Sequence, residues 1–348
     1  ALGLLGGSGT PAPGYQGSIP EYEVNRERVP GTYDPNRRPG SGGQRYFTDA
    51  QYQAKGTNTA APQTAEGLAA INASKTYPWH DISIFVKNGV YAEKVEVYSW
   101  NTRIKLIGES KENTIITYGD HFNKINLGRN STFHTYTLMV RGNDFSAQNL
   151  TIINSAGAVG QAVALHIEAD RVSINNVAIK GHQDSLYLAG EGFRSYFKDC
   201  YIEGTTDFIF GEGTAMFEDC EIKSLSNSYI TAASTPKNQA FGFVFNRVKL
   251  TASAAVDKVY LGRPWRHHAK TVFINSDLGQ HIAPEGWQNW GDVSKKETVF
   301  YAEFNNSGQG ANSSKRVAWA HQLSQVEAQD YTIKNVMRGW QPNIVSKK

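Results

Sequence analysis

A short pattern recurs along the middle of the chain, in which Asn, Asp or another polar residue precedes an Ile or Leu by three positions. The sequence intervals between successive apolar positions of this pattern are 27, 23, 20, 28 and 28, and each position follows a segment with aromatic or β-branched residues. Short β-type segments at this period, with no helix between them, predict a parallel β-helix in which each repeat forms one coil. The pairs are Asn149/Ile152, Asn176/Ile179, Asp199/Ile202, Asp219/Ile222, Arg247/Leu250 and Asn275/Leu278.

Two other all-β architectures fit this pattern less well. A propeller needs repeats of about 40 residues. A sandwich would show hairpin turns, and Asn-Gly or Asp-Gly pairs are nearly absent from the chain. The irregular period places loops of variable length between the strands, where ligand contacts tend to be built.

The two ends of the chain differ from its middle. Residues 1–45 are rich in Gly, Pro, Ser and Arg, and we expect an extended arm there, followed by a single domain over residues 46–348. A short helix is predicted over residues 64–73, and the capping-box sequence Ser324-x-x-Glu327 predicts another over 325–330 that covers the open edge of the last coil. The predicted fold class is all-β, a parallel β-helix with short N- and C-terminal capping helices. Its first β-type segments are expected at 82–86, 90–97, 104–107 and 114–117.

Composition excludes several classes of protein. With 40% hydrophobic and 19% charged residues the chain can bury a core, and its net charge of +3 comes without the basic run or stacking motif of nucleic-acid binders. No stretch approaches the length of about 18 apolar residues that indicates a membrane span. Because the first residue is Ala rather than Met, we expect that a signal or tag precedes this numbering.

The two cysteines occupy the same position of successive repeats, since Cys200 follows Asp199 and Cys220 follows Asp219. Adjacent parallel strands lie about 4.8 Å apart, which fits the roughly 4.4–6.8 Å between the Cα atoms of a disulfide. We therefore predict a Cys200–Cys220 disulfide, which would indicate an oxidising compartment. Two free buried thiols packed in a ladder are the alternative.

Gln161, Asp184 and Asp207 recur at a constant sequence interval of 23, each in a short polar break between apolar segments. Asp184 and Asp207 both lie five positions past an apolar position of the repeat, so we expect them at equivalent places on neighbouring coils. Two carboxylates one strand spacing apart repel, and one is driven to hold a proton while the other stays ionised. The pair can be a general acid beside a nucleophile or base, or it can be an Asp ladder at a solvated edge.

Further residues extend this possible site. The amides of Gln161 and Gln183 can form an oxyanion hole, and Arg263 offers a charged fork for a carboxylate, although each can also be an ordinary surface residue. No Ser or Cys has a matched partner for a triad, and no His/Cys cluster has zinc spacing, so no metal is predicted. Aromatic residues that can form a platform for sugar rings, or belong to the core, are Trp265, Phe210, Tyr187, Trp287 and Trp290.

An ordered set of motifs over residues 80–343 resembles the pectin methylesterases, the pectinesterase family. Each motif alone is modest evidence, whereas the ordered set is highly specific. The motifs are Gly89-Val-Tyr-Ala-Glu93, Gly142-Asn-Asp-Phe-Ser-Ala-Gln-Asn149, Gln161-Ala-Val-Ala-Leu165, Gln183-Asp-Ser-Leu-Tyr187, Asp207-Phe-Ile-Phe-Gly211, Leu261-Gly-Arg-Pro-Trp265, Tyr301-Ala-Glu-Phe-Asn-Asn-Ser-Gly-Gln-Gly310 and Arg316-Val-Ala-Trp319.

This resemblance implies a right-handed parallel β-helix that removes methyl groups from pectin, the methyl-esterified form of homogalacturonan. It implies that Asp207 is the nucleophile that forms an acyl-enzyme, and that Asp184 protonates the departing methanol and then serves as the base for water. Gln161 and Gln183 match the oxyanion donors, and Arg263 matches the residue that orients Asp207. The expected substrate-binding residues are Trp265, Thr137, Phe210 and Tyr187. No metal or organic cofactor is implied.

The sequence departs from the family pattern in a few places. Thr206 stands where Val or Ile is usual, and His182 replaces the usual aromatic residue before Gln183. The long segment before residue 64 resembles that of the longer bacterial-type members.

The expected protein is a monomeric, secreted pectin methylesterase, periplasmic or outer-membrane associated if it is bacterial. Two alternatives stay open: a related esterase or thioesterase with another acyl substrate, and a non-catalytic carbohydrate-binding β-helix. A pectate lyase shares the architecture but uses Ca²⁺ held by carboxylate clusters, and the sequence shows no such cluster.

Overall fold

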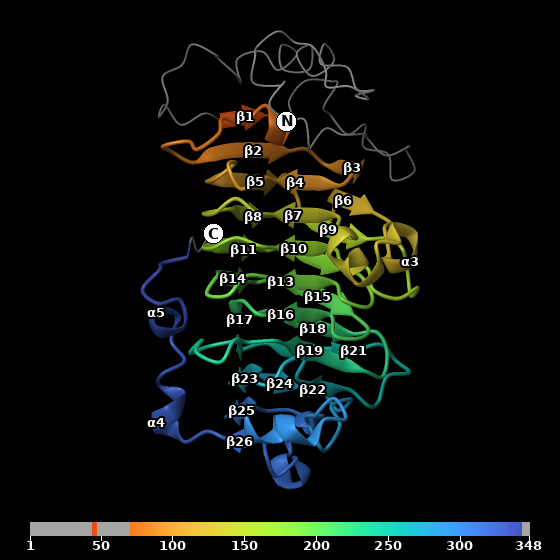
Figure 1. Cartoon of the computed structure of the whole chain (residues 1–348), viewed down its shortest axis with the longest axis vertical. Helices are drawn as coiled ribbons and strands as arrows, with labels where there is room; N and C mark the ends of the chain where they lie inside the picture. The colour runs from red at the N-terminus through yellow and green to blue at the C-terminus, as the bar shows by residue number, and fades with distance from the viewer. Residues whose placement is uncertain (1–43, 47–69, 343–348) are drawn as a thin grey trace.

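The computed structural model describes residues 44–46 and 70–342, which form a parallel β-helix with three sheets (Figure 1). Neighbouring strands within each sheet pair in parallel, and the strands from β2 to β24 fall into the three sheets in regular rotation. The predicted fold class is therefore confirmed.

The strands of the three sheets, in chain order, have the following bounds. The 11-stranded sheet contains β1 (Gln44–Tyr46), β2 (Ile82–Val86), β5 (Ile104–Gly108), β8 (Ser146–Gln148), β11 (Val172–Asn175), β14 (Arg194–Lys198), β17 (Thr214–Glu218), β20 (Phe243–Asn246), β23 (Lys270–Ile274), β25 (Phe300–Phe304) and β26 (His321–Gln322). The eight-stranded sheet contains β3 (Gly89–Ala92), β6 (Thr114–Tyr118), β9 (Thr151–Asn154), β12 (Ala178–Lys180), β15 (Tyr201–Gly204), β18 (Glu221–Ser224), β21 (Lys249–Ala252) and β24 (Asp277–Leu278). The seven-stranded sheet contains β4 (Val95–Val97), β7 (Leu138–Val140), β10 (Leu165–Ile167), β13 (Leu186–Leu188), β16 (Ile209–Gly211), β19 (Tyr229–Ala233) and β22 (Tyr260–Gly262).

The predicted repeat is confirmed as the register of the eight-stranded sheet. Its apolar positions pair in series, from Ile152 with Ile179 through to Leu250 with Leu278, and all of them are buried. The polar residue three positions earlier lies in the turn that follows the 11-stranded sheet, and in all six repeats its φ is between 49° and 57°. Asn and Asp tolerate this left-handed conformation better than most residues, which explains why they mark the pattern.

Aromatic stacking fixes the interior along the coil axis. Phe197, Phe217, Phe245 and Phe273 are buried at one position of successive coils, and their ring centroids are 4.6, 4.5 and 4.3 Å apart. Each such pair contributes about 0.5–1.5 kcal/mol beyond the area it buries. The coils that carry polar turns are therefore held in a rigid register.

The predicted disulfide is wrong in this structure, because Cys200 and Cys220 are free, buried thiols. They do occupy equivalent positions, since the adjacent Tyr201 and Glu221 pair across β15 and β18. Strands in register hold equivalent side chains parallel, about 4.8 Å apart, whereas a disulfide needs its two Cβ atoms within about 3.5–4.5 Å. The sulfur atoms instead contact backbone groups: the Cys200 N–H donates to the Cys220 Sγ at 3.4 Å.

The predicted first strands are confirmed, except that the segment 90–97 is divided into β3 and β4. The described part of the predicted N-terminal helix ends at residue 72. Its Ile71 is buried in the core, as expected for an N-terminal cap. The start of that helix lies outside the described residues. So does the predicted arm over 1–45, apart from the two residues that open β1.

The C-terminal helices lie beside the coils rather than over their end (Figure 1). The predicted capping box is present, and Ser324 caps α4 (Gln325–Ala328), followed by α5 (Ile333–Val336). The prediction that the helix over 325–330 covers the last coil is wrong, since α4 lies beside the coils and none of its residues is buried. At the end of α5, Val336 and Met337 pack with Tyr196 and Met216 on the outer face of the 11-stranded sheet. That face carries apolar side chains that need a cover.

Short helical turns complete the fold. They are α3 (Phe122–Ile125), η2 (Gly128–His134), η3 (Val293–Glu297), η4 (Gln309–Ala311) and η5 (Ser313–Lys315). Within residues 70–342, no helix has the length and apolar character that crossing a membrane requires.

Candidate active site

Asp184 and Asp207 lie in the turns that lead into β13 and β16 of the seven-stranded sheet. Both have positive φ, 64° and 50°, and they are only 8% and 5% exposed. Leu186 pairs with Ile209, at the same sequence interval that separates Asp184 from Asp207. This register confirms that the two carboxyl groups occupy equivalent positions of neighbouring coils.

Gln161 is offset from this series by one position. It forms a parallel bridge with Gln183 rather than with Asp184. The reason is the register of β10 with β13, in which Leu165 pairs with Leu186, a sequence interval shorter than the one from Gln161 to Asp184. The constant sequence interval of 23 therefore does not place Gln161 level with Asp184. The result is a pair of amides beside a pair of carboxyl groups.

Arg263 binds Asp207 through two parallel hydrogen bonds. Its Nε donates to Oδ1 at 2.9 Å and its Nη2 to Oδ2 at 2.7 Å. The guanidinium also lies over the rings of Tyr229 and Trp290, with its Cζ 4.0 and 3.7 Å from their centroids. Burial raises the pKa of Asp207, and the hydrogen bonds and charge of Arg263 oppose that rise. The fork therefore fixes the orientation of the Asp207 carboxyl group and favours its ionised form.

Asp184 has the opposite balance of forces. Burial, and then the negative charge of Asp207, raise its pKa well above the usual value, while Arg263 lowers it. Of the two carboxyl groups, Asp184 therefore holds its proton to the higher pH. This order of the two pKa values makes Asp184 the candidate proton donor and Asp207 the candidate nucleophile.

The side chains of Gln161 and Gln183 are both half-buried and adjacent across their bridge. Amide N–H groups at such a place can donate to an oxygen on which negative charge develops. The geometry is consistent with the predicted oxyanion site.

Aromatic rings cover the seven-stranded sheet next to the carboxyl groups. The ring of Phe210 lies 4.6 Å from that of Tyr187 and 5.9 Å from that of Trp265, and Phe133 lies 5.1 Å from Tyr187. We call these four residues the aromatic platform. Trp290 lies beside it, over Arg263.

Two other residues proposed for this surface do not lie on it. Thr137 is fully buried and its hydroxyl donates to the Ile153 carbonyl at 2.9 Å, so its prediction as a substrate contact is wrong. Trp287 belongs to the core, where its ring stacks on Tyr301 at 4.4 Å. Both side chains satisfy packing needs inside the coil.

Sequence reasoning missed two residues that hold Arg263 in place. Tyr229 follows Asp207 at nearly the same interval that separates Asp207 from Asp184, so its spacing could have indicated a place on the next coil. Lys295, in η3, is buried and its Nζ donates to the Pro264 carbonyl at 3.0 Å. No local pattern reveals Lys295, because it reaches the Arg263–Trp265 segment from a separate turn.

The departure from the family pattern at Thr206 is accommodated by a hydrogen bond, since its hydroxyl lies 2.8 Å from that of Ser228 on the next coil. The Thr206 carbonyl accepts the Asp184 N–H at 3.0 Å. Across residues 44–46 and 70–342, no group of three or more His, Cys, Asp or Glu is placed to hold a metal ion.

Comparison with known proteins gives a consistent result. The pectinesterase family model matches residues 55–340. Putative pectinesterase 11 of Arabidopsis thaliana is 38% identical over 259 residues, which are 74% of this chain and 70% of that protein. The chain spans about half the length of other plant pectinesterases that it matches.

Solved structures share the fold as well. Pectin methylesterase from carrot is 31% identical with a TM-score of 0.74, over 81% of this chain and 95% of that one. A pectin methylesterase solved in complex with a hexasaccharide is 29% identical with a TM-score of 0.70, over 83% and 96% of the two chains. With a family match over most of its length, this chain belongs to the pectinesterase family.

Proposed function

We propose that this protein hydrolyses the methyl esters of pectin, releasing methanol and leaving free carboxylates on the galacturonate chain. The observation that carries the proposal is the buried pair in which Arg263 holds Asp207 through two hydrogen bonds, beside Asp184, whose pKa is raised well above its usual value. An ester needs a nucleophile, a proton donor and an oxyanion site, and this site offers one set of each. The sugar ester is favoured over other acyl substrates by the aromatic platform.

In the first half of the reaction an Asp207 oxygen attacks the C6 carbonyl carbon of a methylated galacturonate. The negative charge moves to the carbonyl oxygen, where the amides of Gln161 and Gln183 donate hydrogen bonds. Asp184 gives its proton to the methoxy oxygen as the C6–O bond breaks, so methanol leaves and an anhydride joins the sugar to Asp207.

In the second half, water attacks the C6 carbon of the anhydride. Asp184, now ionised, accepts a proton from the water, and the bond to Asp207 breaks. The products are a galacturonic acid unit and the regenerated Asp207 carboxylate, which Arg263 is placed to stabilise again. Asp184 ends protonated, so the cycle balances in protons.

The test is methanol release from highly methylated pectin without added calcium, with chain length followed in the same samples. We expect methanol from the wild type, no chain shortening, and no methanol from a folded Asp207→Ala variant. Chain shortening would indicate a lyase. Absence of methanol from a folded wild type, with retained pectin binding, would favour the binding role instead.

We further propose that the protein acts outside the cytoplasm, because pectin is a cell-wall polymer too large to enter a cell. We also propose that it is a monomer in which residues 46–348 form one domain. Fractionation of the source cells and light scattering of the purified protein test location and mass. Recovery of the protein with the cytoplasmic fraction, or a stable dimer mass, would contradict these proposals.

A further inference from the structure

Exposed aromatic side chains gather at the N-terminal end of the coil stack. Tyr77, Trp79 and Trp100 are 68%, 76% and 43% exposed, and they are three of the seven exposed large hydrophobic residues within the described part of the chain. The Tyr77 N–H donates to the Trp100 carbonyl at 2.8 Å, and the ring of Trp100 stacks on that of Tyr98 at 4.9 Å. We call these four residues the N-terminal aromatic patch. Such a group of exposed rings is unusual for a surface without a binding role.

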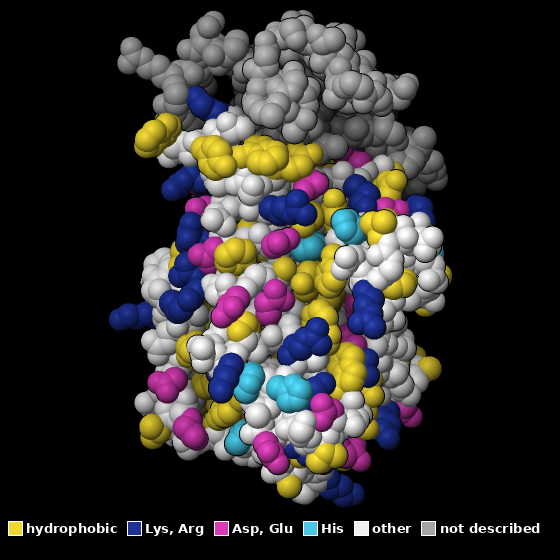
Figure 2. Space-filling model, viewed as in Figure 1, with side chains coloured by type: hydrophobic (Ala, Val, Ile, Leu, Met, Phe, Trp, Pro, Cys, Tyr) yellow, Lys and Arg dark blue, Asp and Glu magenta, His cyan; other side chains and the backbone are white. Residues whose placement is uncertain are grey.

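The patch lies on the same face as the aromatic platform. Tyr98 and Trp100 directly follow β4, which is the end strand of the seven-stranded sheet that carries Phe210 and Tyr187. Figure 2 shows hydrophobic side chains gathered across this face at the level of β2. From β16 to β4 there are four strand steps of about 4.8 Å, so roughly 19 Å separates the Phe210 strand from the strand that leads to the patch.

Rings connect the platform toward the patch. His166 lies between Tyr187 and Tyr136, at 4.6 and 6.2 Å from their centroids. The Tyr136 hydroxyl then donates to Glu96 of β4 at 3.3 Å. His166 and Tyr187 are only 3% and 8% exposed, whereas Tyr136 is half-buried, so Tyr136 is the ring of this series that a polysaccharide between Asp207 and the patch could contact.

The charges along this path balance. Arg141 pairs with Glu96 at 3.1 Å and with Glu168 at 3.7 Å, so one cation is shared between two carboxylates. Lys94, whose Nζ lies 4.5 Å from the centroid of the Tyr136 ring, shares Asp120 with Lys124. Free galacturonate carboxylates therefore meet no net attraction here, and a neutral methyl-esterified chain can bind through ring contacts alone. Aromatic rings suit the apolar C–H faces of sugar rings, with the polar ring edge left in water.

We propose that the N-terminal aromatic patch is a second sugar-binding site, which holds a methyl-esterified stretch of the same homogalacturonan chain whose ester is cleaved at Asp207. This inference rests on the proposed function. It makes binding depend on chain length, because only a polymer long enough to leave the platform and cross Arg141 reaches the patch.

The test compares the wild type with the double variant Trp79→Ala/Trp100→Ala in the full chain, and with Val326→Ala, an exposed apolar residue on α4, as the control. For long, highly methylated pectin we expect KM to rise about five- to tenfold in the double variant with kcat unchanged. For a methylated oligomer that spans only Trp265 to Tyr187, we expect both constants to stay at the wild-type values. The control should match the wild type on both substrates.

Equal KM values for the polymer in the wild type and the double variant would overturn the proposal. So would a rise that is the same for polymer and oligomer, since that indicates damage to the platform. A change in oligomeric state with an unchanged KM would identify the patch as a contact between copies. Two measurements separate failure of this inference from failure of the proposed function. A wild type that releases no methanol refutes the proposed function. Equal affinities for the polymer of Asp207→Ala proteins with and without the Trp79→Ala/Trp100→Ala substitutions refute the second site.

Discussion

Two pairs of aspartates lie in turns of successive coils, and the two pairs differ in burial and in the charges around them. Asp184 and Asp207 follow the eight-stranded sheet, and Asp199 and Asp219 follow the 11-stranded sheet. All four have φ between 50° and 64°, so the backbone places them alike. Their surroundings differ: burial raises the pKa of the first pair, whereas the pKa of Asp219 is lowered.

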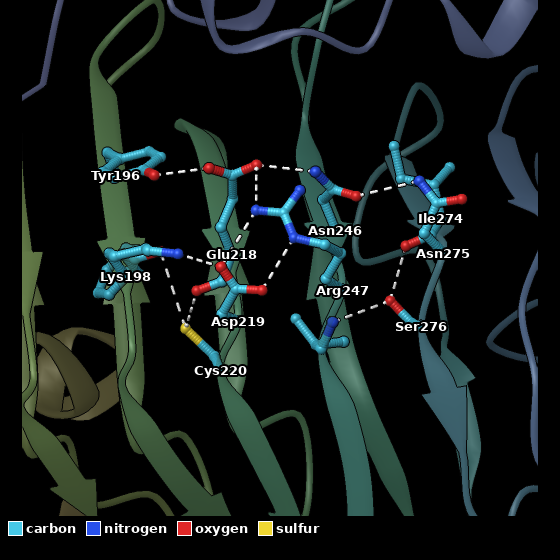
Figure 3. A network of polar contacts seen from close by, with 12 residues as sticks. Tyr196, Lys198, Glu218, Asp219, Cys220, Asn246, Arg247, Ile274, Asn275 and Ser276 are labelled. Atoms are coloured by element: carbon cyan, nitrogen blue, oxygen red, sulfur yellow. Dashed lines mark hydrogen bonds and ion pairs between the residues drawn. The ribbon is translucent and has the colours of Figure 1, made fainter. Parts of the chain in front are cut away.

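Neighbouring cations explain the difference. Burial alone would raise the pKa of Asp219, but Arg247 donates to it at 2.9 and 3.1 Å and Lys198 also binds it, so the cations prevail (Figure 3). The adjacent Glu218 accepts from Tyr196 at 2.6 Å and from Asn246 at 2.7 Å. Asp184 and Asp207 share one guanidinium between them. The fold therefore supplies ladders of aspartates, and the count of cations decides which ladder can hold a proton.

The largest expected effect is a difference in kcat between variants of the two aspartate pairs. Asp207→Asn keeps the shape of the side chain but removes the nucleophile, and we expect kcat to fall by about 10⁴-fold or more. Asp219→Asn, at the equivalent turn of the other ladder, should leave kcat within about twofold, since surface substitutions away from the site change little. Initial rates of methanol release with both purified variants test this. Comparable losses in the two variants would abolish the distinction between the ladders.

The second prediction concerns the proton on Asp184. Asp184→Asn cannot donate to the departing methanol, and we expect kcat to fall about 10²–10⁴-fold. In the wild type, kcat/KM should fall at acid pH as Asp207 takes up a proton, and at alkaline pH as Asp184 loses its own. The variant should lose the alkaline limb while keeping the acid one. Persistence of both limbs would assign the alkaline limb to another group.

The third prediction tests the fork that Arg263 forms with Asp207. Arg263→Lys keeps the charge but loses the two parallel hydrogen bonds and the stacking on Tyr229 and Trp290. We expect kcat to fall by about 10²-fold, as for loss of one transition-state contact. The acid limb of kcat/KM should move to higher pH, because the opposition of Arg263 to the raised pKa of Asp207 weakens.

Arg247→Lys is the matched control, since Arg247 binds Asp219 in the same two-bond manner. It should leave both kcat and the acid limb unchanged. If the acid limb of Arg263→Lys stays in place while kcat falls, the arginine acts on the substrate rather than on Asp207.

Much of the fold was predictable because it repeats. The left-handed residue and the inward Ile or Leu recur once per coil, and a pattern that appears six times reveals the register even without a structure. The carboxyl pair followed from that register. Resemblance of the motifs then supplied roles for Gln161, Gln183 and Arg263.

The errors came from places where the period changes or where contacts are distant. One residue more separates Gln161 from Gln183 than separates Leu165 from Leu186, so the amide moved off the regular series. Cysteines in register suggested a bond that parallel side chains do not make. Thr137 has a polar side chain that a buried carbonyl satisfies, and only the structure shows which way such a hydroxyl is used.

The smallest expected effect is on stability, and its sign differs between the ladders. An Asp with a raised pKa in the folded state costs stability once pH exceeds the unfolded value of about 3.9, because the folded protein holds the proton more tightly. Stability from Asp184 is therefore fully present below that pH and is lost as pH rises. Asp184→Asn removes this loss, so we expect the variant to be more stable than the wild type at neutral pH, by about 1 kcal/mol. Urea unfolding at a series of pH values measures it.

Asp219 should behave in the reverse sense, because its pKa is lowered in the folded state. Its stabilisation is present at neutral pH and disappears as pH falls below about 3.9. Since Arg247 is half exposed, solvent and salt weaken the pair, and Asp219→Asn should cost less than about 1 kcal/mol. At neutral pH we expect Asp184→Asn to raise the free energy of unfolding and Asp219→Asn to lower it. We expect both differences from the wild type to shrink as pH falls. A destabilised Asp184→Asn at neutral pH would mean that Asp184 is ionised in the folded protein, and the assignment of the acid would have to be reversed.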